Sequence, residues 1–117
     1  MSSPEWRPDE LERRRQVEAG KSVVANLARD HALIAWAKAR GAYLRIDRRS
    51  RWGNPYRIGR DGTRDIVCEK YSDHLWRSPE LLARLGETSG KVLACWCYPE
   101  RCHGEVLCEN GERSASS

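Results

Sequence analysis

The stretch KVLACWCYPERCHGEVL, residues 91–107, decides how the rest of the chain is interpreted. Its first six residues are almost continuously apolar, which is typical of a short strand buried on both faces of a parallel sheet. Pro99 can open a final helix that carries Val106 and Leu107. A buried strand that leads into a helix predicts an α/β domain with residues 91–96 at its centre.

Further strands and several helices are expected upstream. Residues 21–26 and 42–47 have the pattern of short strands, and residues 56–58 are expected to be a short extended piece. Helices are predicted over residues 9–19 and 31–40, after Thr63 and after Ser78. The predicted helix caps are Asp9, Asp30 and Thr63, and the predicted breaks are Gly20 and Gly41.

This order of elements predicts an α/β fold, with a small three- to four-stranded sheet flanked by helices and a helical N-terminal extension. Residues 1–41 are expected to form the extension, packed on the domain. Residues 42–111 are expected to form the α/β domain itself, with a W-G-N-P loop and a Cys/His cluster, and residues 112–117 a flexible tail.

Composition favours a cytoplasmic protein. The chain has 117 residues, 32% of them charged, which suits one domain with a modest core. No apolar run approaches the ~20 residues that a membrane-spanning helix needs, so no membrane partner is expected. The first forty residues are polar and basic, unlike a secretory signal, and a cytoplasmic location is therefore expected.

Cysteine and histidine gather after the central strand, at Cys95, Cys97, Cys102 and His103. Alternate residues of a strand face the same side, so Cys95 and Cys97 can present both sulfurs to one place. Cys102 and His103 follow at a turn and can fold back on that place. The four residues could complete a tetrahedral zinc site, which makes zinc the candidate cofactor.

Two other interpretations of these residues remain open. In a thiol active site, a helix start would lower the pKa of a nearby cysteine. Cys97 or Cys102 would then be the nucleophile and His103 the acid/base. Alternatively, Cys95 and Cys97 are small core side chains, while Cys102 and His103 only shape the turn. The odd number of cysteines, five, argues against a complete disulfide framework.

An arginine-rich segment supplies a second candidate site. Residues 45–60 hold six arginines against a single carboxylate, Asp47. Guanidinium groups suit bidentate contact with phosphate, so the expected partner is an anionic ligand, either a nucleotide or a nucleic acid. The expected ligand contacts are the loop residues Arg48, Arg49, Arg51, Trp52, Gly53 and Asn54.

The loop residues have a ligand-binding interpretation and an ordinary one. Trp52 or Tyr56 could stack a base. Gly53 would let the backbone approach the ligand, and Asn54 could read a base edge or a ribose. In the ordinary interpretation the arginines form a solvated basic loop, Trp52 fills the core, and Asn54 with Pro55 fixes a turn.

The two candidate sites meet only if the strands are parallel. Parallel strands over residues 42–47 and 91–96 would bring both following loops to the same sheet edge, the usual ligand crevice of open α/β sheets. One pocket could then be lined by Arg51, Trp52, Asn54, Cys97 and His103. A hairpin between residues 42–47 and 55–58 would break this arrangement.

Three segments together, WGNPY (52–56), TRDIVCEKY (63–71) and GKVLACWCYPERCHGEVL (90–107), resemble a known family. It is the uncharacterised domain-of-unknown-function 4326 family of bacteriophages and actinobacteria. The family pattern is an arginine-rich segment, W-G-N-P with an aromatic residue, a helix, and then G-K-x-L-x-C-W-C-x-P-x-x-C-H-G. The resemblance covers roughly residues 43–107. It implies a small cytoplasmic protein that acts near nucleotides or DNA, and it adds Arg64 to the candidate phosphate contacts.

The sequence therefore predicts a nucleotide- or nucleic-acid-associated protein. Its Cys/His site beside the arginine-rich loop could make it a small group-transfer or hydrolytic enzyme, and whether it catalyses a reaction stays open. The alternative is a zinc-stapled binding module without enzymatic activity. Such a module would bind DNA or a host protein, as a phage-encoded modulator does.

Overall fold

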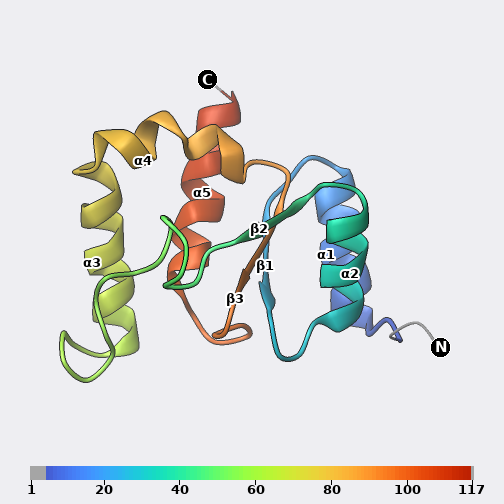
Figure 1. Ribbon diagram of the computed structural model, residues 1–117, viewed down its shortest axis with the longest axis horizontal. Coiled ribbons are helices and arrows are strands. Elements are labelled where there is room, and N and C mark those ends of the chain that lie inside the picture. The colour runs from blue at the N-terminus through green and yellow to red at the C-terminus, as the bar shows by residue number, and fades with distance from the viewer. Residues whose placement is uncertain (1–4, 117) are drawn as a thin grey trace.

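A three-stranded parallel sheet lies at the centre of the computed structural model, which describes the backbone of residues 5–116 and the side chains of residues 5–111. The strands are β1 (Val23–Asn26), β2 (Tyr43–Arg45) and β3 (Val92–Cys95), in the order β1–β3–β2 (Figure 1). Every residue of β3 is buried. The apolar run of residues 91–96 therefore supplies the central strand, as predicted.

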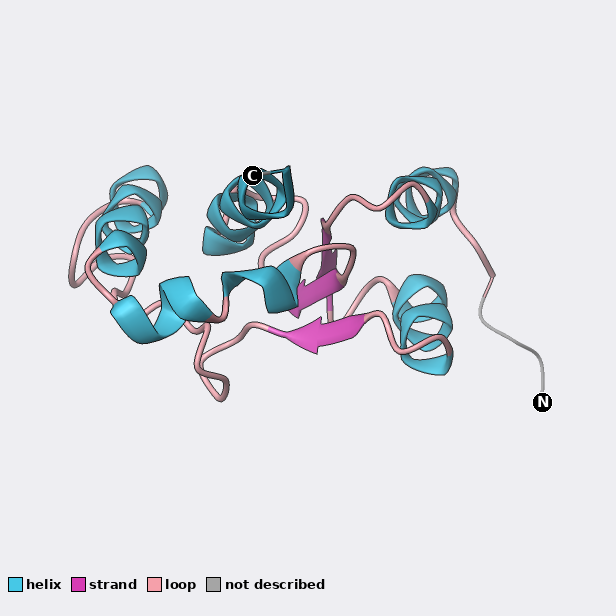
Figure 2. Ribbon diagram, turned by 90° about the horizontal axis from the view of Figure 1, so that it is seen from above, coloured by secondary structure: helices cyan, strands magenta, loops and turns pink. Residues whose placement is uncertain are grey.

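Helices cover both faces of this sheet (Figure 2). α1 (Pro8–Glu18) and α2 (His31–Ala39) pack on one face and α5 (His103–Ser116) on the other, with α3 (Arg64–Trp76) beyond α5. The short α4 (Pro79–Ala83) and the 3₁₀ turn η1 (Leu85–Thr88) connect α3 to β3. The predicted α/β class, with a small sheet flanked by helices, is confirmed.

Two apolar clusters follow from the two-residue period of the strands, because alternate residues point to opposite faces of a sheet. The face under α1 and α2 buries Val23, Ala25, Val92 and Ala94. The opposite face buries Val24, Leu93 and Cys95, together with Trp52, Tyr71 and Leu107. Cys95 thus points to the side of the sheet that α5 covers.

Most helix boundaries follow local sequence signals, but two of the three predicted caps are wrong. α1 has Arg7 at its N-cap, so the predicted cap Asp9 lies inside the first turn. Gly20 and Gly41, with φ of 94° and 73°, follow the ends of α1 and α2. The Thr63 hydroxyl accepts a hydrogen bond from the Ile66 amide at 3.3 Å and caps α3 as predicted. Asp30 precedes α2 but its side chain makes no capping hydrogen bond.

The Asp30 carboxylate instead joins the N-terminal helix to the sheet. Arg13 donates to both carboxylate oxygens of Asp30 at 3.0 Å and to the Val24 carbonyl at 2.8 Å. Arg7 forms a second ion pair with Asp30, and the backbone N–H of Asn26 donates to the same carboxylate at 2.7 Å. Residues 5–41 therefore supply an edge strand and a buried ion pair in addition to helices.

The extended piece expected at residues 56–58 is wrong. These residues lie in a bend and a turn, and the described chain between β2 and α3 contains no strand. The hairpin that would have separated the two candidate sites is therefore not formed. The tail expected at residues 112–117 lies outside the described side chains, although the backbone of α5 is described to Ser116.

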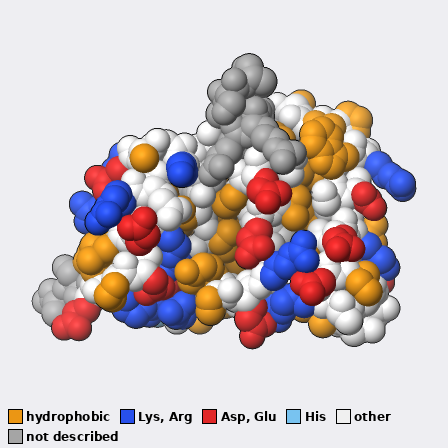
Figure 3. Space-filling model, turned by 180° about the vertical axis from the view of Figure 1, so that it is seen from behind, with side chains coloured by type: hydrophobic (Ala, Val, Ile, Leu, Met, Phe, Trp, Pro, Cys, Tyr) orange, Lys and Arg blue, Asp and Glu red, His pale blue; other side chains and the backbone are white. Residues whose placement is uncertain are grey.

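The described surface mixes charges of both signs. Figure 3 shows acidic and basic side chains interspersed on one face, with a hydrophobic patch at the end where α3 and α4 meet. No helix in the described part of the chain is long and apolar enough to span a membrane.

Candidate ligand pocket and thiol cluster

The two candidate loops leave the sheet at the same edge. β2 and β3 are parallel, with Arg45 opposite Ala94, so both strands end there. The Ile46 amide donates to the Ala94 carbonyl at 2.9 Å and extends the pairing by one step. The arginine-rich loop and the segment after Cys95 then emerge side by side, as the parallel arrangement predicts.

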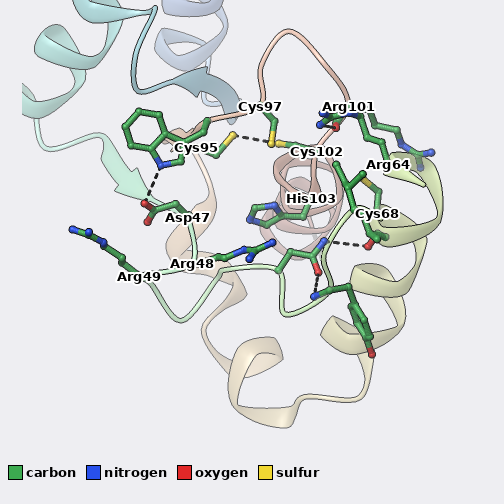
Figure 4. Close-up of a pocket in the computed structure, with 15 residues that line it drawn as sticks. Asp47, Arg48, Arg49, Arg64, Cys68, Cys95, Cys97, Arg101, Cys102 and His103 are labelled. Atoms are coloured by element: carbon green, nitrogen blue, oxygen red, sulfur yellow. Dashed lines mark hydrogen bonds between the residues drawn. The ribbon is translucent and has the colours of Figure 1, made fainter. Parts of the chain in front are cut away.

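A cavity of about 370 Å³ opens between these loops and the start of α3, and we call it the edge pocket. Its walls carry four guanidinium groups, four sulfur atoms and the imidazole of His103. Figure 4 shows Arg64 and Arg101 on one side of the sulfur atoms, and Arg48 and Arg49 beyond His103. The edge pocket therefore combines positive charge with thiol chemistry.

The four arginines of the edge pocket differ in their partners. Arg64 pairs with Glu100 at 2.6 Å, and Arg101 pairs with Asp65 at 3.0 Å. Arg48 and Arg49 are exposed, and neither forms an ion pair with any residue that the structure describes. Arg48 and Arg49 thus hold the guanidinium groups that are available to an external anion.

The other predicted loop contacts fall in different places. Arg51 is exposed and lies outside the walls of the edge pocket. Trp52 is only 1% exposed, and its carbonyl accepts a hydrogen bond from the Tyr71 hydroxyl at 2.8 Å. Trp52 therefore fills the core, which is the ordinary interpretation, and its ring cannot stack a base.

Gly53 and Asn54 shape the loop. A Cβ at Gly53 would lie 2.7 Å from the Arg48 Cα, so the glycine permits a close approach of the loop to itself. The side-chain Nδ2 of Asn54 donates to the Val67 carbonyl at 3.1 Å, and its Oδ1 accepts from the backbone N–H of Tyr56 at 3.0 Å. Asn54 lines the edge pocket, but both ends of its side-chain amide are already used, one to tie the loop to α3 and the other within the loop.

Three of the predicted metal ligands do converge. The Sγ atoms of Cys95, Cys97 and Cys102 all lie within 4.8 Å of one another, and those of Cys95 and Cys102 are 3.3 Å apart (Figure 4). We call these three residues the thiol cluster. Cys95 ends β3, Cys97 follows it by two residues, and Cys102 precedes α5.

Gly104 allows the thiol cluster to form at the start of α5. A Cβ at this position would lie 2.9 Å from side-chain atoms of both Val24 and Ile46. Because the position holds glycine, the first turn of α5 approaches the sheet closely. The Gly104 amide then donates to the Cys102 sulfur at 3.2 Å.

The pKa values of two thiols in the cluster shift in opposite directions. Hydrogen bonds from Cys102 and Cys95, with help from the Arg64 guanidinium, lower the pKa of the half-buried Cys97 thiol. The pKa of the Cys102 thiol is raised by its contacts with Cys95 and Cys97 and by burial. These opposite shifts in pKa make Cys97, on the wall of the edge pocket, the cysteine of the cluster that most favours the thiolate form.

His103 does not join the thiol cluster. Its Nε2 lies 2.7 Å from the Ile46 carbonyl and donates to it, and neither ring nitrogen belongs to the 4.8 Å set of ligand atoms. The ring packs edge-on against Tyr71, with 4.8 Å between ring centroids. Burial lowers the pKa of His103 and keeps the imidazole neutral. The predicted four-ligand set is thus reduced to three sulfurs.

The donor set of the thiol cluster fits a thiophilic metal ion. A tetrahedral zinc centre with Zn–S bonds of ~2.3 Å places its sulfurs roughly 3.8 Å apart, and the cluster holds its sulfurs within 4.8 Å. Three cysteines that lie together in this way could bind a metal. They would supply three of four ligands.

Two residues of this region were not predicted from the sequence. Trp96 lies on the edge pocket, 57% exposed, although residues 91–96 were expected to be a buried strand. Asn26 donates to the carbonyls of Trp96 and Tyr98, at 3.2 and 2.8 Å, and so holds both neighbours of Cys97. No local signal identifies Asn26, since its partners lie 70 and 72 residues away.

Comparison with known proteins gives a viral relative and a family for this chain. A protein of Acanthamoeba polyphaga mimivirus, described as "Uncharacterized protein R718", is 38% identical over 66 residues, which cover 50% of this chain and 50% of the viral protein. The chain thus spans about half the length of this curated relative. No solved structure matches. Residues 27–113, which include β2, β3 and the whole edge pocket, match the family described as "Domain of unknown function (DUF4326)", and the chain belongs to that family.

Proposed function

We propose that the edge pocket binds a phosphate-bearing nucleotide or the phosphorylated end of a nucleic acid. The supporting observation is that Arg48 and Arg49 line the cavity without a carboxylate partner among the described residues. Arginine forks match phosphate oxygens in geometry and charge. The volume, about 370 Å³, lies within the usual range for small-molecule sites.

For the same pocket we propose group transfer or hydrolysis, with Cys97 as the nucleophile. Its lowered pKa and its place on the cavity wall favour it over Cys102, which is buried and has a raised pKa. The sulfur would form a bond to an electrophilic centre of the ligand, the leaving group would depart with the bonding electron pair, and water would release the product. His103 is not assigned as acid/base, because its Nε2 is bonded to the Ile46 carbonyl.

Binding is tested by calorimetry with the four ribonucleoside 5′-monophosphates. Arg48→Ala and Arg49→Ala should each weaken binding about ten- to a hundredfold, since a charge-assisted hydrogen bond is worth ~1.5–3 kcal/mol. Arg51→Ala is the matched control, because Arg51 is exposed in the same loop but lies off the edge pocket. Equal losses for Arg48→Ala and Arg51→Ala would place the anion elsewhere on the basic loop.

Catalysis is tested separately with Cys97→Ala. This variant should bind the nucleotide and lose any transfer or hydrolysis. The control is Cys68→Ala, which removes a pocket cysteine outside the thiol cluster and should keep the activity. Retained turnover in Cys97→Ala would exclude the proposed nucleophile without affecting the binding proposal.

The thiol cluster supports a second candidate function. Zinc held by Cys95, Cys97 and Cys102 would staple β3 to α5, and the protein would then be a binding module for DNA or a host protein, of phage or actinobacterial origin. Elemental analysis of purified protein should find one equivalent of zinc, which Cys102→Ser loses and Cys68→Ala keeps. If a strong chelator removes the zinc and the melting temperature of the protein does not change, the staple is excluded.

A further inference from the structure

Two aromatic side chains, Tyr56 and Trp96, line the edge pocket; Tyr56 is half-buried, with the Lys70 Nζ 5.5 Å from its ring centroid, and Trp96 is exposed. It is 57% exposed, in contrast to Trp52 of the arginine-rich loop, which is 1% exposed. It follows directly on the buried strand β3. The chain therefore turns a tryptophan outward at the edge where the arginines and the thiol cluster meet.

This exposure is accompanied by firm anchoring. The Trp96 Nε1 donates to an Asp47 carboxylate oxygen at 3.3 Å, and its backbone carbonyl accepts from the Asn26 side chain at 3.2 Å. Asp47 is itself buried and pairs with Arg45 at 2.7 Å. The polar edge of the indole is thus satisfied inside the protein, and its orientation is set at two points.

The ring faces of Trp96 have few partners. The Arg45 guanidinium carbon lies 6.0 Å from the ring centroid, and no other ring or cation contact to Trp96 occurs among the described residues. By comparison, Trp36 contacts Trp6, Arg14 and Arg40. A fixed indole with an open face, beside two unpaired arginines, has the character of a stacking platform.

We propose that Trp96 stacks the nucleobase of the ligand, while Arg48 and Arg49 hold its phosphate. This inference rests on the proposed anion site and narrows its ligand to a base-bearing phosphate. Stacking is tolerant of base identity, because every nucleobase has a π face. Of the two residues that the sequence suggested for stacking, Trp52 is buried, whereas Tyr56 lines the edge pocket but is half-buried, so we assign the stacking role to the more exposed Trp96.

The test compares two kinds of ligand by calorimetry on the full chain. The base-bearing ligands are the four ribonucleoside 5′-monophosphates, and the baseless ligand is ribose 5-phosphate. The wild type should bind at least one monophosphate about tenfold more tightly than ribose 5-phosphate, because stacking on an aromatic side chain is worth ~1–3 kcal/mol per base. A 5′-phosphorylated dinucleotide that binds more tightly still would identify a strand end as the ligand.

Three variants separate stacking from general effects. Trp96→Ala should abolish the preference for the base-bearing ligand and leave ribose 5-phosphate binding unchanged, whereas Trp96→Phe should keep most of the preference. Trp76→Ala is the matched control, because Trp76 is 56% exposed and lies off the edge pocket. Melting temperatures show whether each variant is folded.

The outcomes distinguish the two proposals. Equal affinity of wild type for both kinds of ligand, or a preference that survives Trp96→Ala, would overturn the stacking platform and leave the phosphate site standing. If the wild type binds neither monophosphates nor ribose 5-phosphate, both proposals are wrong.

Discussion

Replacing Asp30 with asparagine should destabilise the protein strongly, because it breaks a buried ion pair. Asp30 is fully buried and accepts hydrogen bonds from Arg13 at 3.0 Å, while Arg13 itself is 6% exposed. Removing one partner of such a pair leaves the other charge buried and costs about 3–5 kcal/mol. A domain of this kind has a total stability of about 5–15 kcal/mol, so Asp30→Asn removes a large share of it.

The same substitution should change the pH dependence of stability. Burial acts to raise the pKa of Asp30, but the hydrogen bonds from Arg13 and the Asn26 amide outweigh it, and the net shift is downward. A carboxyl whose pKa is lower in the folded state contributes stability that is fully present above its unfolded pKa of about 3.9. That contribution is lost as the pH falls through the folded-state pKa. The difference in unfolding free energy between wild type and Asp30→Asn should therefore be largest at neutral pH and shrink under acid conditions.

Thermal unfolding followed by circular dichroism measures both effects. At roughly 4 °C per kcal/mol, Asp30→Asn should lower the melting temperature by about 10–20 °C at neutral pH. The control is Glu18→Gln, which breaks the exposed pair of Glu18 with Arg14 at 3.5 Å and should cost at most about 0.5 kcal/mol. Equal melting temperatures for Asp30→Asn and Glu18→Gln, or a loss that grows on acidification, would refute the reasoning.

Three further perturbations test the region around the thiol cluster. Diamide, which takes up the two hydrogens of a thiol pair, should link Cys95 to Cys102, whose sulfurs are 3.3 Å apart, and peptide mass spectrometry should find this disulfide even in Cys97→Ala. Gly104→Ala should cost about 1–3 kcal/mol in urea unfolding, because the new Cβ meets side chains of the sheet at 2.9 Å, whereas Gly86→Ala, with nothing within 4 Å, should be near neutral. His103→Ala should lower the unfolding free energy by about 2–4 kcal/mol, since it opens a cavity and strips a buried carbonyl of its donor; a variant that melts like wild type would contradict the structural role of this imidazole.

Local signals were sufficient for most of the elements. Thr63 caps a helix, and Gly20 and Gly41 stop two others, because these preferences act over a few residues of backbone. The apolar run of residues 91–96 indicated the central strand. The prediction that the Cys95 and Cys97 sulfurs meet is confirmed, but the two-residue period of a strand is not the reason, because β3 ends at Cys95 and Cys97 lies in the following loop.

Only the tertiary structure decided which tryptophan is buried and which group holds the His103 imidazole. Trp52 fills the core and Trp96 is exposed because β3 ends at Cys95, one residue earlier than the apolar pattern suggests. His103 is held by a carbonyl 57 residues away, and Asp30 is drawn from its helix cap by Arg13. These outcomes depend on partners distant in the chain that meet only after the sheet has formed. The sequence by itself therefore determined the kinds of chemistry present, and long-range packing determined which side chains can reach a ligand.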